Sequence, residues 1–191
     1  MGSGSLCGGC RAHLLLAPER FLNGVGVVRP GFVHDTVART LVHHLKYRGV
    51  VAAGAILAET MASLIPAGTT LVAVPRLGWR RLRYGIDPGD ELASAVARLT
   101  GQPMARVLRA PLSGRARAGR AHGAAPAFRL AGPPPTDPVV LIDDVVTTGT
   151  TLVVAAVLLP RVVGAVTATG AGVGVPEVTS LPLESRRAGG R

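Results

Sequence analysis

The sequence is poor in aromatic residues, in cysteine and in lysine, and it lacks a long hydrophobic run. Phe, Trp and Tyr make up 3% of the 191 residues, while hydrophobic residues make up 48%, so a core must be built from Val, Leu, Ala and Ile. No apolar stretch approaches the roughly 18 residues that a membrane helix needs. The start of the chain has neither the basic residues nor the apolar segment of a secretory signal. We therefore expect a cytoplasmic protein without membrane insertion.

The two cysteines, Cys7 and Cys10, are too few for a disulfide framework. Their spacing is that of a metal-binding pair, but a structural zinc ion normally takes four ligands, and His13 could add only a third. The alternative is a pair of reduced thiols, as is usual in the cytoplasm. Zinc at Cys7 and Cys10 is therefore one of two hypotheses.

Basic residues outnumber acidic ones by 21 to 11, and Lys46 is the only lysine among them. Ten arginines lie between Arg76 and Arg120, against three acidic residues, so this segment carries much of the net charge of +10. The forked guanidinium group suits phosphate oxygens, which indicates a phosphorylated metabolite or a nucleic acid as partner. A GC-rich genome would explain the choice of arginine, but not its clustering.

The hydrophobic pattern alternates between helical and strand-like segments. Residues 1–30 have no regular pattern, and a turn is expected at Gly164 before a strand-like run over residues 165–175. The pattern predicts helices at 36–48, 51–65, 91–99 and from about 150, and strands at 71–75, 104–109 and 139–142. Such alternation predicts an α/β domain with a mostly parallel central sheet flanked by helices. We expect this domain to cover residues 31–175, between a short segment over 1–30 and a disordered tail over 176–191.

The stretch VVLIDDVVTTGTTL, residues 139–152, carries the strongest chemical signal. Four apolar residues without alternation predict a strand buried on both faces, and Asp143 and Asp144 are expected at its tip. Ligands of parallel sheets bind beyond the carboxyl ends of the strands, where the loop after Pro75 should also lie. Two adjacent carboxylates repel each other, so they need donors or a cation, which the hydroxyl groups of a sugar or Mg²⁺ could supply.

The hydroxyl-rich loop that follows suits a phosphate group. Backbone N–H groups from Val145 to Gly149 can form an anion-binding nest, and the helix from about Thr150 points its amino end at the same place. Threonine hydroxyls add further donors. The two acids suit the hydroxyls of a ribose, and the loop suits its phosphate. Together they predict a ribose 5-phosphate ligand. The alternative is an ordinary helix cap, for which one acid and one threonine would suffice.

VVLIDDVVTTGTTL resembles the PRPP-binding signature of type I phosphoribosyltransferases. Other segments resemble, in the same order, those of the ComF family, which are competence-associated phosphoribosyltransferase-like proteins. These segments are LCGGCRAHL (the end of a zinc module), LVHHLKYRG, LVAVPRLGWRRLRYG and RAGRAHGAAPAF. The resemblance implies the type I phosphoribosyltransferase fold and transfer of a phosphoribosyl group from PRPP, with release of pyrophosphate, to an unidentified acceptor.

The resemblance also implies roles for individual residues. Asp143 and Asp144 would hold the ribose hydroxyls, and Mg²⁺ would be bound mainly by PRPP itself. The 5-phosphate would lie against Val145, Val146, Thr147, Thr148, Gly149, Thr150 and Thr151. Arginines of two loops would face the pyrophosphate and close over the site, namely Arg76, Arg80, Arg81, Arg83, Arg109 and Arg120.

The chain departs from the family after the first arginine loop, where it has Tyr84-Gly85-Ile86-Asp87-Pro88 in place of Arg-Gly-Phe-Asn-Gln. A second hypothesis is therefore a module that senses PRPP or a nucleotide without turnover, with DNA or competence proteins as partners. A third is direct nucleic-acid binding through the arginine loops. Trp79 and Tyr84 are the only aromatic residues there, which gives single-strand stacking little support.

Overall fold

A computed structural model of the chain describes residues 6–76, 85–111 and 128–171. The strands of the main sheet lie in the order β1-β2-β8-β7-β3-β4, and β5 and β6 form a separate two-stranded sheet. The elements are α1 (Gly8–Ala12), β1 (Arg20–Leu22), β2 (Gly26–Val33), α2 (Thr36–Arg48), α3 (Val51–Ser63), β3 (Thr70–Ala73), α5 (Pro88–Thr100), β4 (Met104–Ala105), β5 (Leu108–Arg109), β6 (Arg129–Leu130), β7 (Val139–Val146), α6 (Thr150–Ala156) and β8 (Val162–Gly170).

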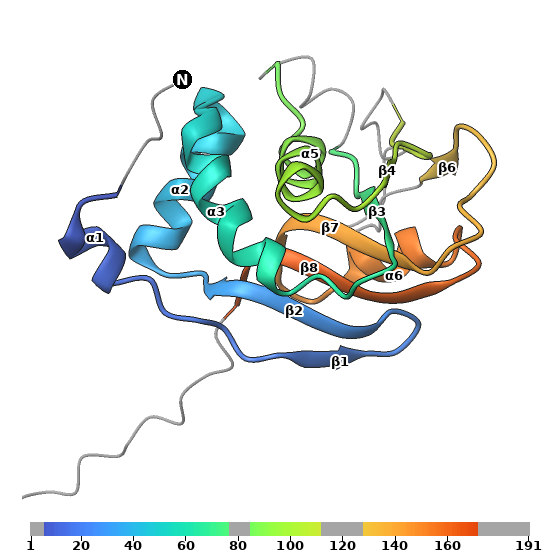
Figure 1. The fold of residues 1–191 in the computed structure, drawn as a ribbon, viewed down its shortest axis with the longest axis horizontal. Helices are drawn as coiled ribbons and strands as arrows, with labels where there is room; N and C mark the ends of the chain where they lie inside the picture. The colour runs from blue at the N-terminus through green and yellow to red at the C-terminus, as the bar shows by residue number, and fades with distance from the viewer. Residues whose placement is uncertain (1–5, 77–84, 112–127, 172–191) are drawn as a thin grey trace, which may run out of the picture.

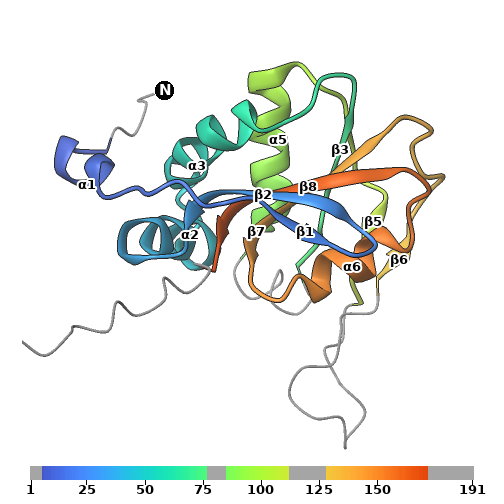
Figure 2. The ribbon, with the colours of Figure 1, turned by 90° about the horizontal axis from the view of Figure 1, so that it is seen from below.

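The main sheet is mostly parallel, because every pairing except β1 with β2 is parallel. Helices α2, α3 and α5 cover one face, and α6 covers the other (Figures 1 and 2). Each face has its own apolar core, and the central strands β7 and β8 contribute to both. The predicted α/β architecture, with a mostly parallel central sheet flanked by helices, is confirmed.

The predicted helices form close to their expected bounds. α2 ends at Gly49 and α5 at Gly101, and both glycines have the positive φ of a left-handed cap, at 62° and 70°. α5 begins with Pro88, whose fixed φ and missing N–H suit the first turn of a helix. Within the described residues, no helix is long and apolar enough to cross a membrane.

The irregular structure predicted for residues 1–30 is wrong for β1 and for β2. β2 pairs with β8 through six residue pairs, so a strand near the start of the chain lies inside the sheet. The domain boundary expected at residue 30 falls within this strand. Pro30 lies within β2, beyond Val28, the last residue of β2 that pairs with β1.

Two other predicted details are corrected. Gly164 does not form a turn but lies inside β8, where a Cβ atom would approach the carbonyl oxygen of Val27 to 2.5 Å. A glycine is needed here for close contact between backbones rather than for a bend. The single strand expected over residues 104–109 is two separate two-residue strands, β4 and β5, which belong to different sheets.

Candidate functional site at the carboxyl edge of the sheet

The parallel strands β2, β8, β7 and β3 all end at one edge of the sheet. β3 and β7 are neighbours, and the N–H of Val74 donates to the carbonyl of Ile142 at 2.8 Å. The segments that follow Pro75 and Ile142 therefore leave adjacent strands, as expected. α2 begins at the same edge, after β2, and its carboxyl end returns to this edge at Lys46 (Figure 1).

Asp143 and Asp144 lie within β7 and not beyond its tip. The strand continues to Val146, because Asp143 pairs with Thr167 and Val145 pairs with Thr169 of β8. The expectation that the acids emerge at the end of a four-residue strand is thus corrected. Successive strand residues point to opposite faces, so the two carboxylates need not share one environment.

Asp144 forms an ion pair with Lys46, with 2.9 Å between Oδ2 and Nζ. The side chains are 12% and 23% exposed, so water screens the pair only in part. Lys46 comes from the last turn of α2, and Asp144 is separated from it by almost a hundred residues. The ion pair joins the helix layer to the acidic end of β7. It gives Asp144 a positive partner, as expected for one of two adjacent carboxylates.

Asp143 has a different environment. One of its oxygens, Oδ1, accepts the N–H of Asp144 at 2.8 Å, and within the described residues no ion pair reaches this carboxylate. Burial, and next the negative charge of Asp144, raise the pKa of Asp143 well above its ordinary value. The two acids therefore differ, since Asp144 is paired with a lysine and Asp143 favours its protonated form or a hydrogen-bond donor.

The loop after β7 offers several donors to a ligand. Within the described residues, no backbone carbonyl accepts the N–H groups of Thr147, Thr148 or Gly149. The side chains of Thr147, Thr148 and Thr150 are exposed, and the hydroxyls of Thr148 and Thr150 lie 3.0 Å apart. α6 begins at Thr150 as predicted but has only seven residues, so the donors of the loop matter more than the helix dipole.

Val145 and Val146, also predicted at the phosphate site, have packing roles. Val145 contacts the core on the side of α2, and Val146 is buried in the core on the side of α6. Their side chains anchor the end of β7, and the loop proper begins at Thr147. Gly149 has φ +80° and lies against Leu22, and only glycine combines this φ with so close a contact.

A hydrogen-bonded chain that the sequence did not indicate joins three strands near the acids. Nδ1 of His34, just after β2, lies 2.8 Å from the hydroxyl of Thr169, and this hydroxyl donates to the carbonyl of Asp144 at 3.3 Å. Burial and the positive charges of Lys46 and Arg39 lower the pKa of His34. A neutral imidazole with the proton on Nδ1 satisfies both contacts.

Arg76 links the segment after β3 to its neighbours through hydrogen bonds. Its guanidinium donates to the carbonyl of Lys46 at 2.8 Å and lies 5.1 Å from the centre of the Tyr47 ring. Its N–H donates to Oδ2 of Asp87, just before α5, at 3.1 Å. Arg76 thus holds the carboxyl end of α2 against the segment after β3, and the ion pair of Lys46 follows from this placement.

The other predicted arginines are not all brought to this edge. Arg109 lies on β5, in the separate two-stranded sheet, opposite Arg129. Within the described residues, no hydrogen bond or ion pair joins Arg109 to the two acids. The remaining four, which are Arg80, Arg81, Arg83 and Arg120, lie outside the described residues.

The two cysteines lie at the start of α1, away from any metal-binding cluster. Cys10 donates its N–H to Sγ of Cys7 at 3.4 Å, and this bond lowers the pKa of Cys7, while a side-chain hydrogen bond with Cys7, and next the charge of Cys7, raise the pKa of Cys10. Among the described residues, no group of three His, Cys, Asp or Glu side chains could hold a metal ion, so His13 does not complete a zinc site.

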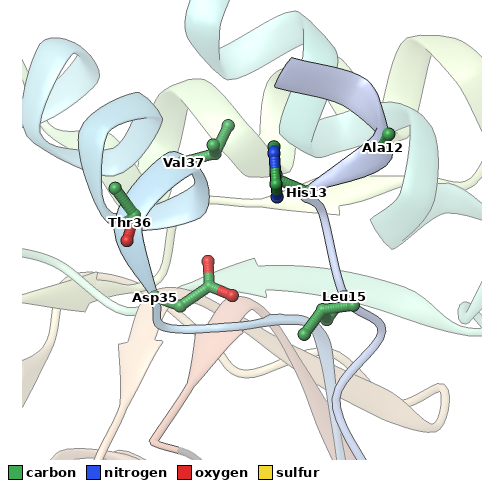
Figure 3. A pocket seen from close by; sticks show the side chains of 6 residues that line it. All are labelled: Ala12, His13, Leu15, Asp35, Thr36 and Val37. Atoms are coloured by element: carbon green, nitrogen blue, oxygen red, sulfur yellow. The ribbon is translucent and has the colours of Figure 1, made fainter. Parts of the chain in front are cut away.

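A cavity of about 300 Å³ lies between α1 and the first turn of α2. Figure 3 shows the imidazole of His13 and the carboxylate of Asp35 on its two sides. Asp35 precedes α2 without capping it through its side chain. The residues that line this cavity do not include Lys46, Asp143 or Asp144.

Comparisons with protein families and with curated proteins give no match. Among solved structures, the chain is similar to the crystal structure of orotate phosphoribosyltransferase from Mycobacterium tuberculosis, solved in complex with Fe(III) dicitrate. The identity is 21%, the TM-score is 0.38, and the alignment covers 85% of this chain and 82% of that one.

Proposed function

We propose that the chain binds 5-phosphoribosyl 1-diphosphate (PRPP) at the carboxyl edge of the sheet, and that it transfers the phosphoribosyl group to an acceptor with release of pyrophosphate. One observation carries the proposal: two carboxylates in unlike environments, Asp143 and Asp144, directly precede a loop with free N–H groups and threonine hydroxyls. A ribose 5-phosphate presents the matching groups, which are neighbouring hydroxyls and a phosphate one sugar away. The narrower resemblance to the ComF family belongs to this proposal.

The two carboxylates would accept hydrogen bonds from the ribose hydroxyls. Hydroxyl donors would offset the burial that raises the pKa of Asp143, so its ionised form would be favoured in the complex. Asp144 is held in place by its ion pair with Lys46. The pair would thereby fix the sugar ring, which is the main contribution that a protein makes when a reaction depends on positioning.

Transfer would join the acceptor to the anomeric carbon as the bond to pyrophosphate breaks. The lone pair of the acceptor forms the new bond, the electrons of the old bond leave with pyrophosphate, and the acceptor loses its proton to water. Of the arginines expected to face the pyrophosphate, Arg76 is the one that contacts the backbone of Lys46 in the described residues. Charge on the leaving group is the feature that such side chains stabilise.

Magnesium fits this arrangement only as an ion that PRPP carries. Mg²⁺ typically uses one or two carboxylates together with phosphate oxygens and water, and it would neutralise charge on the pyrophosphate. The described residues offer two neighbouring carboxylates, and no cluster of three ligands. Asp143 and Asp144 are therefore the residues that would contact the ion.

Calorimetric titration with PRPP in the presence of Mg²⁺ tests the proposal. We expect saturable binding that Asp143→Asn weakens by about tenfold or more, because a charged acceptor for a buried hydroxyl is lost. Asp137→Asn, at an exposed position before β7, is the matched control and should bind like the native chain. Equal affinity for all three proteins, or no binding, would refute the proposal.

Turnover needs a separate measurement. Release of pyrophosphate, assayed with a panel of nucleobases and amines, would distinguish a transferase from a protein that only senses PRPP. Binding of PRPP without release of pyrophosphate on any acceptor would identify a protein that only senses PRPP.

A further inference from the structure

Arg20 on β1 is a cation for which the described residues provide no anion. Its Nε and Nη2 atoms are buried, and neither has a hydrogen-bond partner in the described part of the chain. The acid beside it, Glu19, is bonded to Arg29 at 2.7 Å. Buried donors and charges are costly when they are left unpaired, so the position calls for an anionic acceptor.

The strand register places Arg20 on the face of the sheet that α6 covers. Arg20 pairs with Val28, and Leu22 pairs with Gly26. Directly paired residues of antiparallel strands point to the same face. Val28 and Leu22 both belong to the apolar core on the side of α6, so Arg20 shares that side.

The contacts of β1 with α6 give the level of Arg20 along the sheet. Leu22 touches Gly149, the residue before α6, and Gly24 lies beside Val153, one turn further along that helix. β1 and α6 therefore run side by side in the same direction, as Figure 2 shows. Two strand residues span about 6.6 Å, so Arg20 is displaced by this distance from Leu22 in the direction of the amino end of α6.

The loop Thr147–Gly149 connects β7 to α6 and therefore lies at the amino end of this helix. We infer that Arg20 is a phosphate-binding residue, which reaches across from the edge strand β1 to the group held by this loop. The inference rests on the proposed function for the identity of the ligand, the 5-phosphate of a phosphoribosyl group. The N–H groups and threonine hydroxyls of the loop supply directed donors but no full charge. A guanidinium group adds a full positive charge and two parallel N–H donors that match two phosphate oxygens.

Arg20→Gln, compared with the native chain, tests the assignment by titration with ribose 5-phosphate, PRPP with Mg²⁺, and inorganic phosphate. We expect affinity for the two sugar phosphates to fall by about 10- to 100-fold, as for a lost hydrogen bond to a charged group. Arg161→Gln removes the same charge at the opposite end of the sheet, where Arg161 donates to the carbonyl of Thr136, and should leave affinity unchanged.

Phosphorus NMR of PRPP gives a readout that a structural role would not produce. The signal of the 5-phosphate should differ between the complexes of the native and Arg20→Gln chains, whereas the diphosphate signals should coincide. Changes confined to the diphosphate would overturn the assignment.

Stability provides a second readout in case Arg20→Gln perturbs folding. Arg20→Met removes an uncompensated buried cation and keeps the aliphatic stem. In phosphate-free buffer its melting temperature should equal or exceed that of the native chain, while the stabilisation by ribose 5-phosphate should disappear. A lower melting temperature with full stabilisation by the ligand would identify Arg20 as structural and overturn the inference.

The outcomes separate this inference from the proposed function. PRPP binding that is equal in the native and Arg20→Gln chains overturns the role of Arg20 and leaves the function intact. Binding of inorganic phosphate that depends on Arg20, without binding of either sugar phosphate, refutes the function and supports the anion site. No binding of any of the three probes by the native chain overturns both.

Discussion

At the scale of single residues, the pair of Lys46 and Asp144 shows how a site is assembled from distant parts of a chain. The sequence required a partner for two adjacent carboxylates, and it contains one lysine. Only the fold reveals that this lysine reaches one of the two acids. The carboxyl end of α2 is brought there by the contacts of Arg76 with Lys46 and Tyr47.

Removal of Lys46 should destabilise the protein through Asp144. In Lys46→Met the carboxylate stays largely buried without its cation, and we expect a loss of about 2 kcal/mol in the free energy of unfolding, below the value for a fully buried pair because water reaches both side chains. Urea denaturation at neutral pH measures the change.

The double variant Lys46→Met/Asp144→Asn is the control for this prediction. It removes the orphaned charge and should regain part of the lost stability, so that the effects of the two substitutions are not additive. Additive losses would mean that the ion pair does not couple the two residues.

Asp143 should make stability depend on pH in the opposite sense to a salt-bridged acid. Its pKa is raised in the folded state, so the folded chain retains a proton that the unfolded chain has already lost. Stability therefore falls as pH rises from about 4, the ordinary aspartate pKa, through the raised value. Asp143→Asn cannot ionise, and its stability relative to the native chain should increase across that window.

Thermal or urea unfolding at several pH values checks this prediction, with Asp137→Asn as the reference. This exposed aspartate undergoes the same chemical change outside the site. A native chain whose stability relative to Asp143→Asn improves with rising pH would show that the acid is stabilised in its ionised form, contrary to the prediction.

At the scale of elements, the sequence predicted the helices better than the outer strands. α2 and α5 are marked by apolar spacing and by terminal glycines, which are local signals. β1 and β2 lack such a signal. Gly26, Pro30 and Gly31 interrupt the pattern of β2, which is stabilised by pairing with β8 far along the chain, and the three-residue β1 pairs only with β2. The misplaced turn at Gly164 has the same cause, since a glycine needed for close packing resembles one needed for a turn.

The loop between β7 and α6 depends on Gly149 for two reasons, and they can be separated. Gly149→Ala would impose a positive φ on alanine and would also push a Cβ into Leu22. Gly49→Ala, at the end of α2, has a positive φ with open space around it. We expect about 1 kcal/mol of destabilisation for Gly49→Ala and at least 1 kcal/mol more for Gly149→Ala.

Unfolding measurements on both variants give the comparison, and Gly149→Ala/Leu22→Ala isolates the steric part. The smaller side chain should relieve the clash, so the cost of the glycine substitution should fall when it is measured in the Leu22→Ala background. An unchanged cost would mean that β1 does not pack against this loop, and it would also remove the placement on which the role of Arg20 depends.

At the scale of the whole molecule, the sequence located the acidic end of β7 and the loop after it but not what surrounds them. Residues 139–152 are contiguous, so their motif can be recognised from the sequence alone. The alternation of helices and strands predicts a parallel sheet, and with it the edge at which this motif lies. His34, Thr169 and Arg20 lacked any such signal. His34 and Thr169 meet through the pairing of β2 with β8, and Arg20 reaches the sheet through the pairing of β1 with β2; no local pattern encodes these pairings.

The net charge of +10 makes two kinds of anionic partner plausible for the whole molecule, and the two acids distinguish them. Binding to DNA would depend on the total positive charge and would weaken steeply with salt. Binding to PRPP would depend on the carboxylates as hydroxyl acceptors. The double variant Asp143→Asn/Asp144→Asn removes the negative charge of this edge of the sheet, so it should affect the two ligands differently.

We therefore expect this double variant to lose affinity for PRPP by about tenfold or more, while its affinity for a DNA oligonucleotide stays equal or rises. Calorimetry with PRPP and Mg²⁺, together with fluorescence anisotropy of labelled DNA at low and at physiological salt, measures both. A melting curve first establishes that the variant is folded, which is expected because both acids are costly to bury. Parallel loss of both affinities would place DNA at the acidic edge, whereas undiminished PRPP affinity would mean that the carboxylates do not hold the ribose.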